Sequence, residues 1–176
     1  MRDVLSWQAP GARIDAIEAA IDAGDVAALP VLEKVVLSSD PEGAPTIIRA
    51  VASLGARAGV AETHAAAQTL SRWLEAESGR DGLDARGNVS VLVDALGDLG
   101  GADSAQALAS ALDQGSLPLH VQTLAVQRLA QLGDTSASDA IARFAARIAA
   151  LPPAEGIDES LREEALTVAS NATPQP

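Results

Sequence analysis

The chain has no cysteine and no tyrosine, and Trp7, Trp73 and Phe144 are the only aromatic residues among its 176. Without cysteine it can form no disulfide, thiolate metal site or thiol nucleophile. No apolar run approaches the ~20 residues that a membrane-spanning helix needs. The first residues lack the apolar stretch of a signal peptide. We therefore expect a cytoplasmic protein; a periplasmic or exported protein trimmed of its leader is the alternative.

Positive charge is also scarce. Lysine and arginine total 12 against 24 acidic residues, which gives a net charge of −12, and Lys34 is the only lysine. Nucleic acids and anionic membranes are bound by clustered lysine and arginine side chains. We therefore expect no nucleic-acid partner and no membrane insertion.

Alanine, by contrast, is abundant, and alanine is the strongest helix former. Apolar residues recur at the i, i+3, i+4 spacing that places one apolar stripe along a helix. Each stripe stops at a glycine, which can adopt the left-handed conformation that closes a helix. These patterns predict an all-α fold. The four stripes are Ile14, Ile17 and Ile21 before Gly24; Ile47, Ile48, Val51 and Leu54 before Gly55; Leu92, Val93, Leu96 and Leu99 before Gly100; and Leu124, Val126, Leu129 and Leu132 before Gly133.

A second helix is predicted after each of these glycines, so that every unit is a helix, a tight turn and another helix. Asp25 and Asp134 can accept hydrogen bonds from the free N–H groups that begin the second helix. The four glycines are 31, 45 and 33 residues apart. The longest interval contains residues 78–87, which are polar and rich in glycine and are predicted to form a loop. The near-constant spacing of the turns favours a repeat array over a closed helical bundle.

These elements divide the chain into three parts. An N-terminal capping segment (1–10) precedes a repeat domain (11–171), and a disordered tail (172–176) follows it. Val4, Leu5 and Trp7 are expected to cover the first hairpin, with Trp7 as an anchor for a partner as the alternative. The units of the repeat domain are predicted at about 11–38, 44–77, 88–114 and 118–150, followed by a closing helix at 159–170.

The turn sequences Leu99-Gly100-Gly101 and Leu132-Gly133-Asp134, with residues 25–32 (DVAALPVL), resemble the signature of short bacterial HEAT repeats. The phycobilin lyases are the best-known group with this pattern. The resemblance covers residues 11–171 and implies a right-handed α-solenoid of about four HEAT-like helical hairpins plus a C-terminal capping helix. The second repeat departs from the pattern because Ala56, not aspartate, follows Gly55.

Few residues are suited to catalysis. The chain contains no HExxH sequence, nucleophile elbow, phosphate-binding loop or dinucleotide fingerprint. His64 falls on the predicted inward stripe of its helix and is expected to pack in the core, whereas His120 is expected at the surface. Asp94 and Asp98 share one face of a helix and are predicted to be solvated instead of holding a cation. We expect no enzyme activity, no cofactor and no metal.

The remaining charges suggest a binding surface. In the HEAT-like solenoids that the chain resembles, the second helices line the concave surface where partners bind. The alternative is that the arginines of these helices pair with acidic residues on adjacent turns. The first helices instead expose the acidic residues Asp15, Glu18, Asp22, Asp94 and Asp98. The candidate partner-binding residues on the second helices are Lys34, Arg72, Arg143 and Arg147.

Together, these features favour a non-catalytic scaffold that binds another protein, as a monomer or as part of a hetero-complex. An accessory subunit of a bilin-lyase-like enzyme is the alternative that the resemblance implies. A tetrapyrrole pocket calls for aromatic side chains, which this chain largely lacks. A DNA glycosylase built on HEAT-like repeats would need a basic groove, which the net charge of −12 disfavours.

Overall fold

The computed structural model describes residues 10–35, 37, 42–150 and 159–172, and within these ranges the regular structure is helical. The described residues form nine α-helices and a short 3-10 helix, η2 (Val26–Ala28), which confirms the predicted all-α class. The α-helices are α1 (Pro10–Ala23), α2 (Leu29–Leu32), α3 (Ala44–Ala56), α4 (Val60–Ser78), α5 (Leu83–Leu99), α6 (Gly101–Gln114), α7 (Leu119–Leu132), α8 (Thr135–Ala150) and α9 (Glu159–Ala172).

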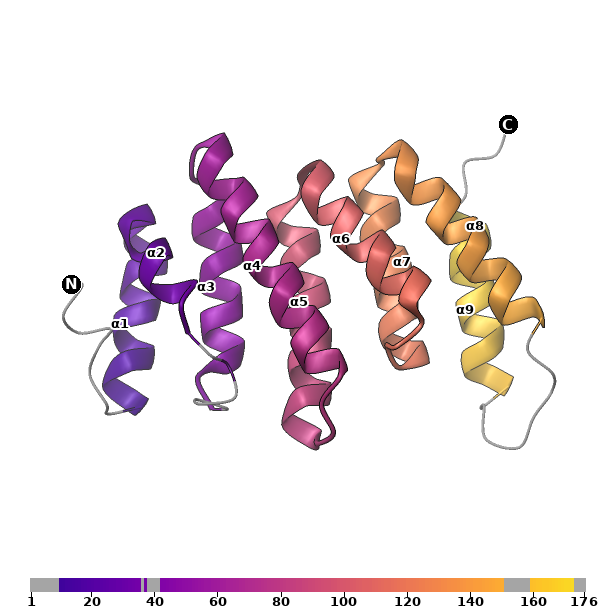
Figure 1. Ribbon diagram of the computed structural model, residues 1–176, viewed down its shortest axis with the longest axis horizontal. Helices are drawn as coiled ribbons and strands as arrows, with labels where there is room; N and C mark the ends of the chain where they lie inside the picture. Colours follow the sequence, from indigo (N-terminus) through magenta and orange to yellow (C-terminus); the bar gives the residue numbers. More distant parts are fainter. Residues whose placement is uncertain (1–9, 36, 38–41, 151–158, 173–176) are drawn as a thin grey trace.

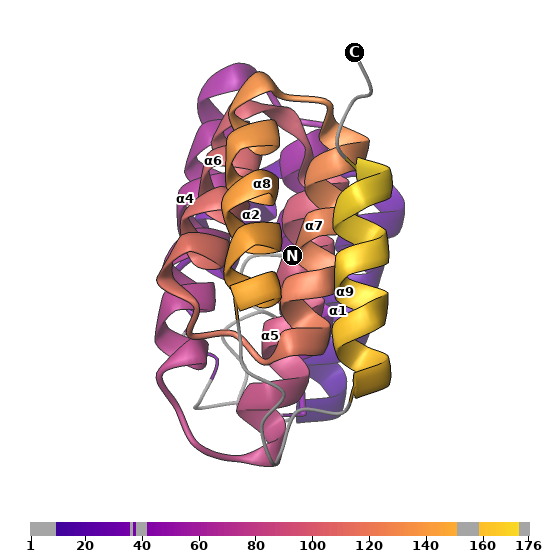
Figure 2. The ribbon, with the colours of Figure 1, turned by 90° about the vertical axis from the view of Figure 1, so that its right-hand side faces the viewer.

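The helices lie in two rows (Figures 1 and 2). The first row contains α1, α3, α5, α7 and α9, and each of these helices packs against the next in the row. The second row contains α2, α4, α6 and α8, in which α4 packs against α6 and α6 against α8. Helices adjacent in sequence also pack across the rows, as in α3 with α4 and α5 with α6. The chain is therefore an array of sequential helical pairs.

The apolar stripes form a core between the rows. Ile47, Ile48, Val51 and Leu54 of α3 are fully buried, as are Leu92, Val93 and Leu96 of α5. A helix with one apolar face must bury that face against another element. Here each pair is covered by the next pair along the array. One connected cluster of buried residues consequently extends from Ile17 to Ala169.

Three of the four predicted turn glycines have the positive φ that closes a helix. The φ angles are 61° at Gly24, 75° at Gly100 and 66° at Gly133. Glycine adopts such angles without the steric penalty that a Cβ atom brings. The predicted cap after the first turn is also present, because Asp25 Oδ1 accepts a hydrogen bond of 3.2 Å from the N–H of Ala27.

Gly55 has a different role from the one predicted. The helix α3 continues to Ala56, so Gly55 lies inside it and does not end it. A Cβ atom at position 55 would lie 2.7 Å from the Cβ of Ala66 in α4 and 3.0 Å from Leu99 Cδ1 in α5. Glycine at this position lets three helices approach one another.

The prediction of a loop over residues 78–87 was wrong for six of these ten residues, which are helical. The helix α4 runs to Ser78 and α5 begins at Leu83, so only residues 79–82 lie between them. The first turns of α5 are anchored by the core: Ala85 is 1% exposed, and the buried Asn88 donates a hydrogen bond to the buried Glu77 of α4. Tertiary contacts such as these override the weak helix propensity of a polar, glycine-containing sequence.

The helix α9 packs against α7 and α8 at one end of the array. It buries Ala165 and Ala169 and runs to Ala172, two residues beyond the predicted closing helix. The predicted N-terminal cap of Val4, Leu5 and Trp7 and the tail residues 173–176 lie outside the described residues. Among the helices that the structure describes, none is long and apolar enough to cross a membrane.

Candidate functional site

Two grooves open between neighbouring helices of the second row. The α2–α4 groove has a volume of about 560 Å³ and lies between Glu33, Lys34 and Val35 on one side and Arg72, Trp73 and Ala76 on the other. The α4–α6 groove has a volume of about 390 Å³, and His64, Gln68, Asp103 and Gln106 are among the residues that line it. Arg72 lines both grooves. The two grooves are thus neighbouring hollows on one face, with Arg72 on the ridge between them.

Lys34 and Arg72, two of the predicted partner-binding residues, are brought together at the α2–α4 groove. Both side chains are exposed. Arg72 Nη2 donates a hydrogen bond of 2.9 Å to Thr69 Oγ1, and within the described residues neither cation lies within ion-pair distance of a carboxylate. Burial raises the pKa of Glu33 in the same groove, and the positive charge of Arg72 partly offsets that rise.

A buried carboxylate marks one end of this groove. Glu77 is 4% exposed and accepts hydrogen bonds from Arg80 Nη1 at 2.5 Å and from Asn88 Nδ2 at 3.0 Å. A buried carboxylate is tolerated only when its oxygens are paired in this way. The Glu77 contacts therefore fix Arg80 at the groove and join the end of α4 to α5.

Trp73 is the groove residue that sequence reasoning missed. Its side chain is 9% exposed, at the border between core and surface, and it lines the groove beside Arg72. Tryptophan combines a large apolar area with a polar N–H group and is enriched at binding hot spots. The adjacency of Arg72 and Trp73 in a chain with so few aromatic residues is the signal that would have identified it.

Arg143 and Arg147, the other two predicted partner-binding residues, line neither of these grooves and contact the neighbouring helices instead. Arg143 Nε and Nη2 donate to Asp113 Oδ1 and Oδ2 of α6 at 3.0 and 2.8 Å. This pairing lowers the pKa of Asp113 and raises the pKa of Arg143.

Arg147 donates to the carbonyl of Leu112 at 2.8 Å and to Gln122 Oε1 at 2.6 Å, and its guanidinium lies 5.6 Å from the centre of the Phe144 ring. The Leu112 carbonyl, which also accepts the backbone N–H of Gly115 at 3.2 Å, lies in the last turn of α6, where the helix dipole favours a cation. Arg143 and Arg147 consequently tie α8 to the helices before it.

The prediction that His64 packs in the core was wrong. Its side chain is 52% exposed, and its Nδ1 lies 2.8 Å from Asp103 Oδ2 of α6. Its Nε2 lies 2.8 Å from the amide nitrogen of Gln68. Since an amide nitrogen only donates, His64 Nε2 accepts from Gln68, and Nδ1 is the protonated nitrogen that donates a hydrogen bond to Asp103 Oδ2. Both ring nitrogens thus have a hydrogen-bond partner, and the His64–Asp103 pair links α4 to α6. His120 is exposed, as predicted.

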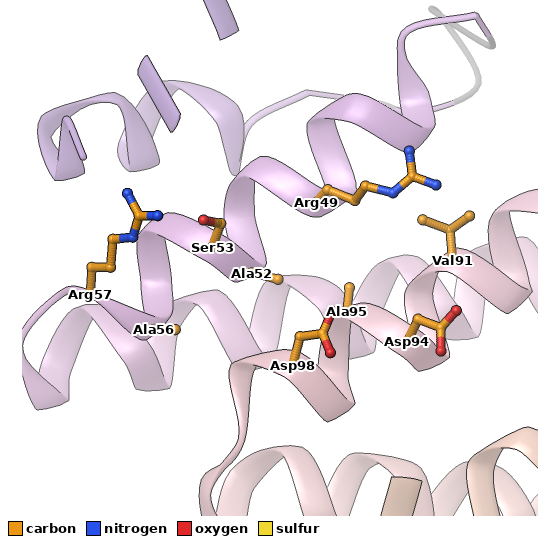
Figure 3. Close-up of a pocket in the computed structure, with 9 residues that line it drawn as sticks. All are labelled: Arg49, Ala52, Ser53, Ala56, Arg57, Val91, Asp94, Ala95 and Asp98. Carbon is orange, nitrogen blue, oxygen red and sulfur yellow. The ribbon is translucent and has the colours of Figure 1, made fainter. Parts of the chain in front are cut away.

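A third groove, of about 460 Å³, lies in the first row between α3 and α5 (Figure 3). Asp94 Oδ1 accepts hydrogen bonds from Arg128 Nε and Nη2 of α7 at 2.9 and 2.7 Å, and Asp98 lies 3.4 Å from the same guanidinium. These carboxylates, predicted to be solvated, share a cation thirty or more positions away in the sequence. At the end of α3, Arg57 Nη1 donates to the carbonyl of Ile21 at 2.8 Å.

These contacts connect α1 to α3 and α5 to α7, so the polar side chains of the α3–α5 groove mainly join neighbouring pairs. A group of three or more acidic or histidine side chains able to hold a metal ion is absent from the part of the chain that the structure describes. In comparisons with models of known protein families, with curated proteins and with solved structures, nothing matches the chain. The comparisons therefore identify no family.

Proposed function

We propose that this chain is a non-catalytic protein-binding scaffold. Its sequential helical pairs would form a right-handed HEAT-like solenoid, and its partner would occupy the face made by α2, α4 and α6. The observation that carries this proposal is the meeting of two open grooves at Arg72, with Lys34 and Trp73 alongside. A partner segment lying across this ridge would contact both grooves at once.

Charge supports this placement. The chain as a whole carries −12, so most of its surface repels an acidic partner. Lys34 and Arg72 present cations that lack a carboxylate partner within the described residues, and a local patch of opposite sign steers and orients a partner. Arg143 and Arg147 are engaged within the molecule, so the proposed binding residues narrow to Lys34, Arg72 and Trp73.

The experiment is affinity capture from lysate of the source cells with two matched double variants. Lys34→Glu/Arg72→Glu reverses two charges at the proposed face. Arg49→Glu/Arg86→Glu makes the same change of net charge at exposed positions of α3 and α5 in the first row. We expect the first variant to lose a protein that the wild type and the second variant both retain.

Far-UV circular dichroism should show the same helicity for all three proteins, because all four substituted side chains are exposed. A partner lost on the Arg49→Glu/Arg86→Glu variant and kept by Lys34→Glu/Arg72→Glu would move the binding face to the first row. A bound tetrapyrrole in the purified protein, visible as colour, would contradict a scaffold without a cofactor.

A further inference from the structure

We infer that the α2–α4 groove binds a peptide segment of the partner in which an acidic side chain stands beside an apolar one. This inference rests on the proposed function and names the chemistry of the segment that the partner supplies. The acidic side chain would meet Lys34 and Arg72, and the apolar side chain would lie against Trp73 and Val35.

The groove lies between two helices that differ in length. The helix α2 has 4 residues and packs against α3, whereas α4 has 19 residues and packs against α3, α5 and α6. Elsewhere in the second row, α6 and α8 have 14 and 16 residues and pack closely on their neighbours. The later half of α4, with Arg72, Trp73 and Ala76, therefore borders open space on its α2 side.

The charges at the groove favour a carboxylate ligand. Among the described residues that line it, Lys34, Arg72 and Arg80 are basic, and Glu33 and Glu77 are acidic. Arg80 is engaged by Glu77, which leaves Lys34 and Arg72 to meet the ligand. Glu33 lies on the same wall as Lys34 and would repel a carboxylate placed next to it. A carboxylate is thus best accommodated toward Arg72, where the guanidinium can donate two parallel hydrogen bonds.

The apolar part of the groove would receive the apolar side chain of the peptide. Trp73 and Leu37 are buried at its base, and Val35 is half-buried beside them. A volume of about 560 Å³ lies within the range of ~300–1,000 Å³ typical of ligand sites. An aliphatic or aromatic side chain that covers the indole would remove apolar surface from water on both partners. The α2–α4 groove differs in this from the α4–α6 groove, since the described lining of the α4–α6 groove contains neither tryptophan nor phenylalanine.

The test uses random peptides displayed on phage, selected against the full-length chain carrying Trp7→Phe. The chain has two tryptophans and no tyrosine, so this variant leaves Trp73 as its only strong fluorophore. We expect the selected peptides to combine Asp or Glu with a neighbouring apolar residue. Synthetic copies of them should change the Trp73 emission on binding.

Three variants then locate the bound peptide. Lys34→Glu/Arg72→Glu should weaken binding by about tenfold or more, because two favourable charges become repulsive. Ala76→Phe should weaken it comparably by filling the groove without changing its charge, since Ala76 is exposed there. Arg49→Glu/Arg86→Glu should leave binding unchanged within about twofold, because both side chains are exposed on first-row helices and neither lines the groove, so salt weakens their effect on a peptide bound there.

Selected peptides without acidic residues, or peptides that bind all three variants equally, would overturn the inference. Such a peptide result overturns only the inference about the α2–α4 groove, and the capture experiment tests the proposed function separately. If the captured protein partner is lost on Lys34→Glu/Arg72→Glu but still binds Ala76→Phe, the binding face stands and the partner lies in the α4–α6 groove instead. If capture is unaffected by both variants, the proposed face and the inference both fail.

Discussion

Gly55→Ala adds a single methyl group at the point where α3, α4 and α5 meet. The new Cβ would lie 2.7 Å from Ala66 Cβ and 3.0 Å from Leu99 Cδ1. The Leu99 methyl can shift with its side chain, but the Cβ of Ala66 is fixed to the backbone of α4. The substitution therefore forces the helices of one pair apart.

Two opposing effects set the size of the change. Alanine is more favourable than glycine inside a helix by about 1 kcal/mol. Overpacking a tight core costs typically ~1–3 kcal/mol, and we expect the upper part of this range because a backbone-linked atom must move. The net result should be a loss of about 1–2 kcal/mol in the free energy of unfolding.

Gly87→Ala is the matched control. Gly87 is exposed in α5, and a Cβ there would meet no atom within 4 Å. The same substitution should therefore raise stability by up to about 1 kcal/mol. The free energies of unfolding of the two variants are expected to differ by about 1–3 kcal/mol although the chemical change is identical.

The assay is urea unfolding followed by far-UV circular dichroism, with the thermal midpoint as a second measure. A change of 1 kcal/mol in the free energy of unfolding shifts the thermal midpoint by about 2–4 °C for a chain of this size. Ala66→Gly removes the Cβ atom that the new methyl group meets. Its effect on the free energy of unfolding should therefore be more favourable by about 1 kcal/mol in the Gly55→Ala variant than in the wild type, because substitutions of contacting residues are coupled. The reasoning is refuted if Gly55→Ala stabilises the protein as much as Gly87→Ala does.

Three further variants test contacts between the helical pairs. Arg128→Gln removes the hydrogen bonds to Asp94, and because both side chains are partly exposed we expect thermal unfolding to show a loss of only about 0.5–1 kcal/mol that shrinks with added salt. Glu77→Ala leaves the buried Asn88 amide without its acceptor and should cost about 1–3 kcal/mol in urea unfolding, whereas Glu77→Gln, which keeps an acceptor, should cost less. Arg143→Gln removes the group that lowers the pKa of Asp113. Because this pKa is lower in the folded than in the unfolded chain, the Arg143–Asp113 pair stabilises the fold at pH values above the ordinary pKa of 3.8, and the stabilisation is lost as the pH falls through the folded-state pKa. The thermal midpoint of Arg143→Gln should consequently fall below that of the wild type at pH 7 and approach it in strong acid, and a difference that persists there would contradict the ionic role.

Local sequence patterns predicted the parts of this fold that local physics controls. The apolar stripes, the turns at Gly24, Gly100 and Gly133, and the cap by Asp25 each depend on residues within a few positions of one another. Gly55 fits the same pattern but has a different role. Its neighbours Ala66 and Leu99 come from two other helices. In the sequence, a glycine that ends a helix and a glycine that allows close packing both follow an apolar stripe, so the pattern does not distinguish them.

The side-chain contacts that sequence reasoning missed depend on residues distant in the chain. Asp94 meets Arg128 from the next pair, and Arg143 meets Asp113 from α6. Neither contact has a local signature, because each partner is set by the packing between helices. The prediction for His64 failed for a related reason. Successive residues of a helix point about 100° apart, so a small error in the position of the apolar stripe places an exposed residue in the core.

Lys34 and Arg72 were selected from their expected position on second helices, and the structure brings them to one groove. That groove, which lies between the short α2 and the longer α4, was not foreseen, because its walls come from helices that α3 separates in the chain. Residues 79–82 connect α4 to α5 where a ten-residue loop was predicted, and the buried Glu77 and Asn88 explain why α5 begins early.

The most direct test of the proposed binding face is photo-crosslinking from single positions to the captured partner. Benzoylphenylalanine is introduced at Glu75, which is exposed on α4 three positions after Arg72 and lines neither groove that meets at Arg72, and in a second protein at Ala56, exposed in the α3–α5 groove. We expect a covalent adduct with the partner from position 75 and none from position 56. An adduct from position 56 alone would place the partner on the first row and contradict the binding face proposed for α2, α4 and α6.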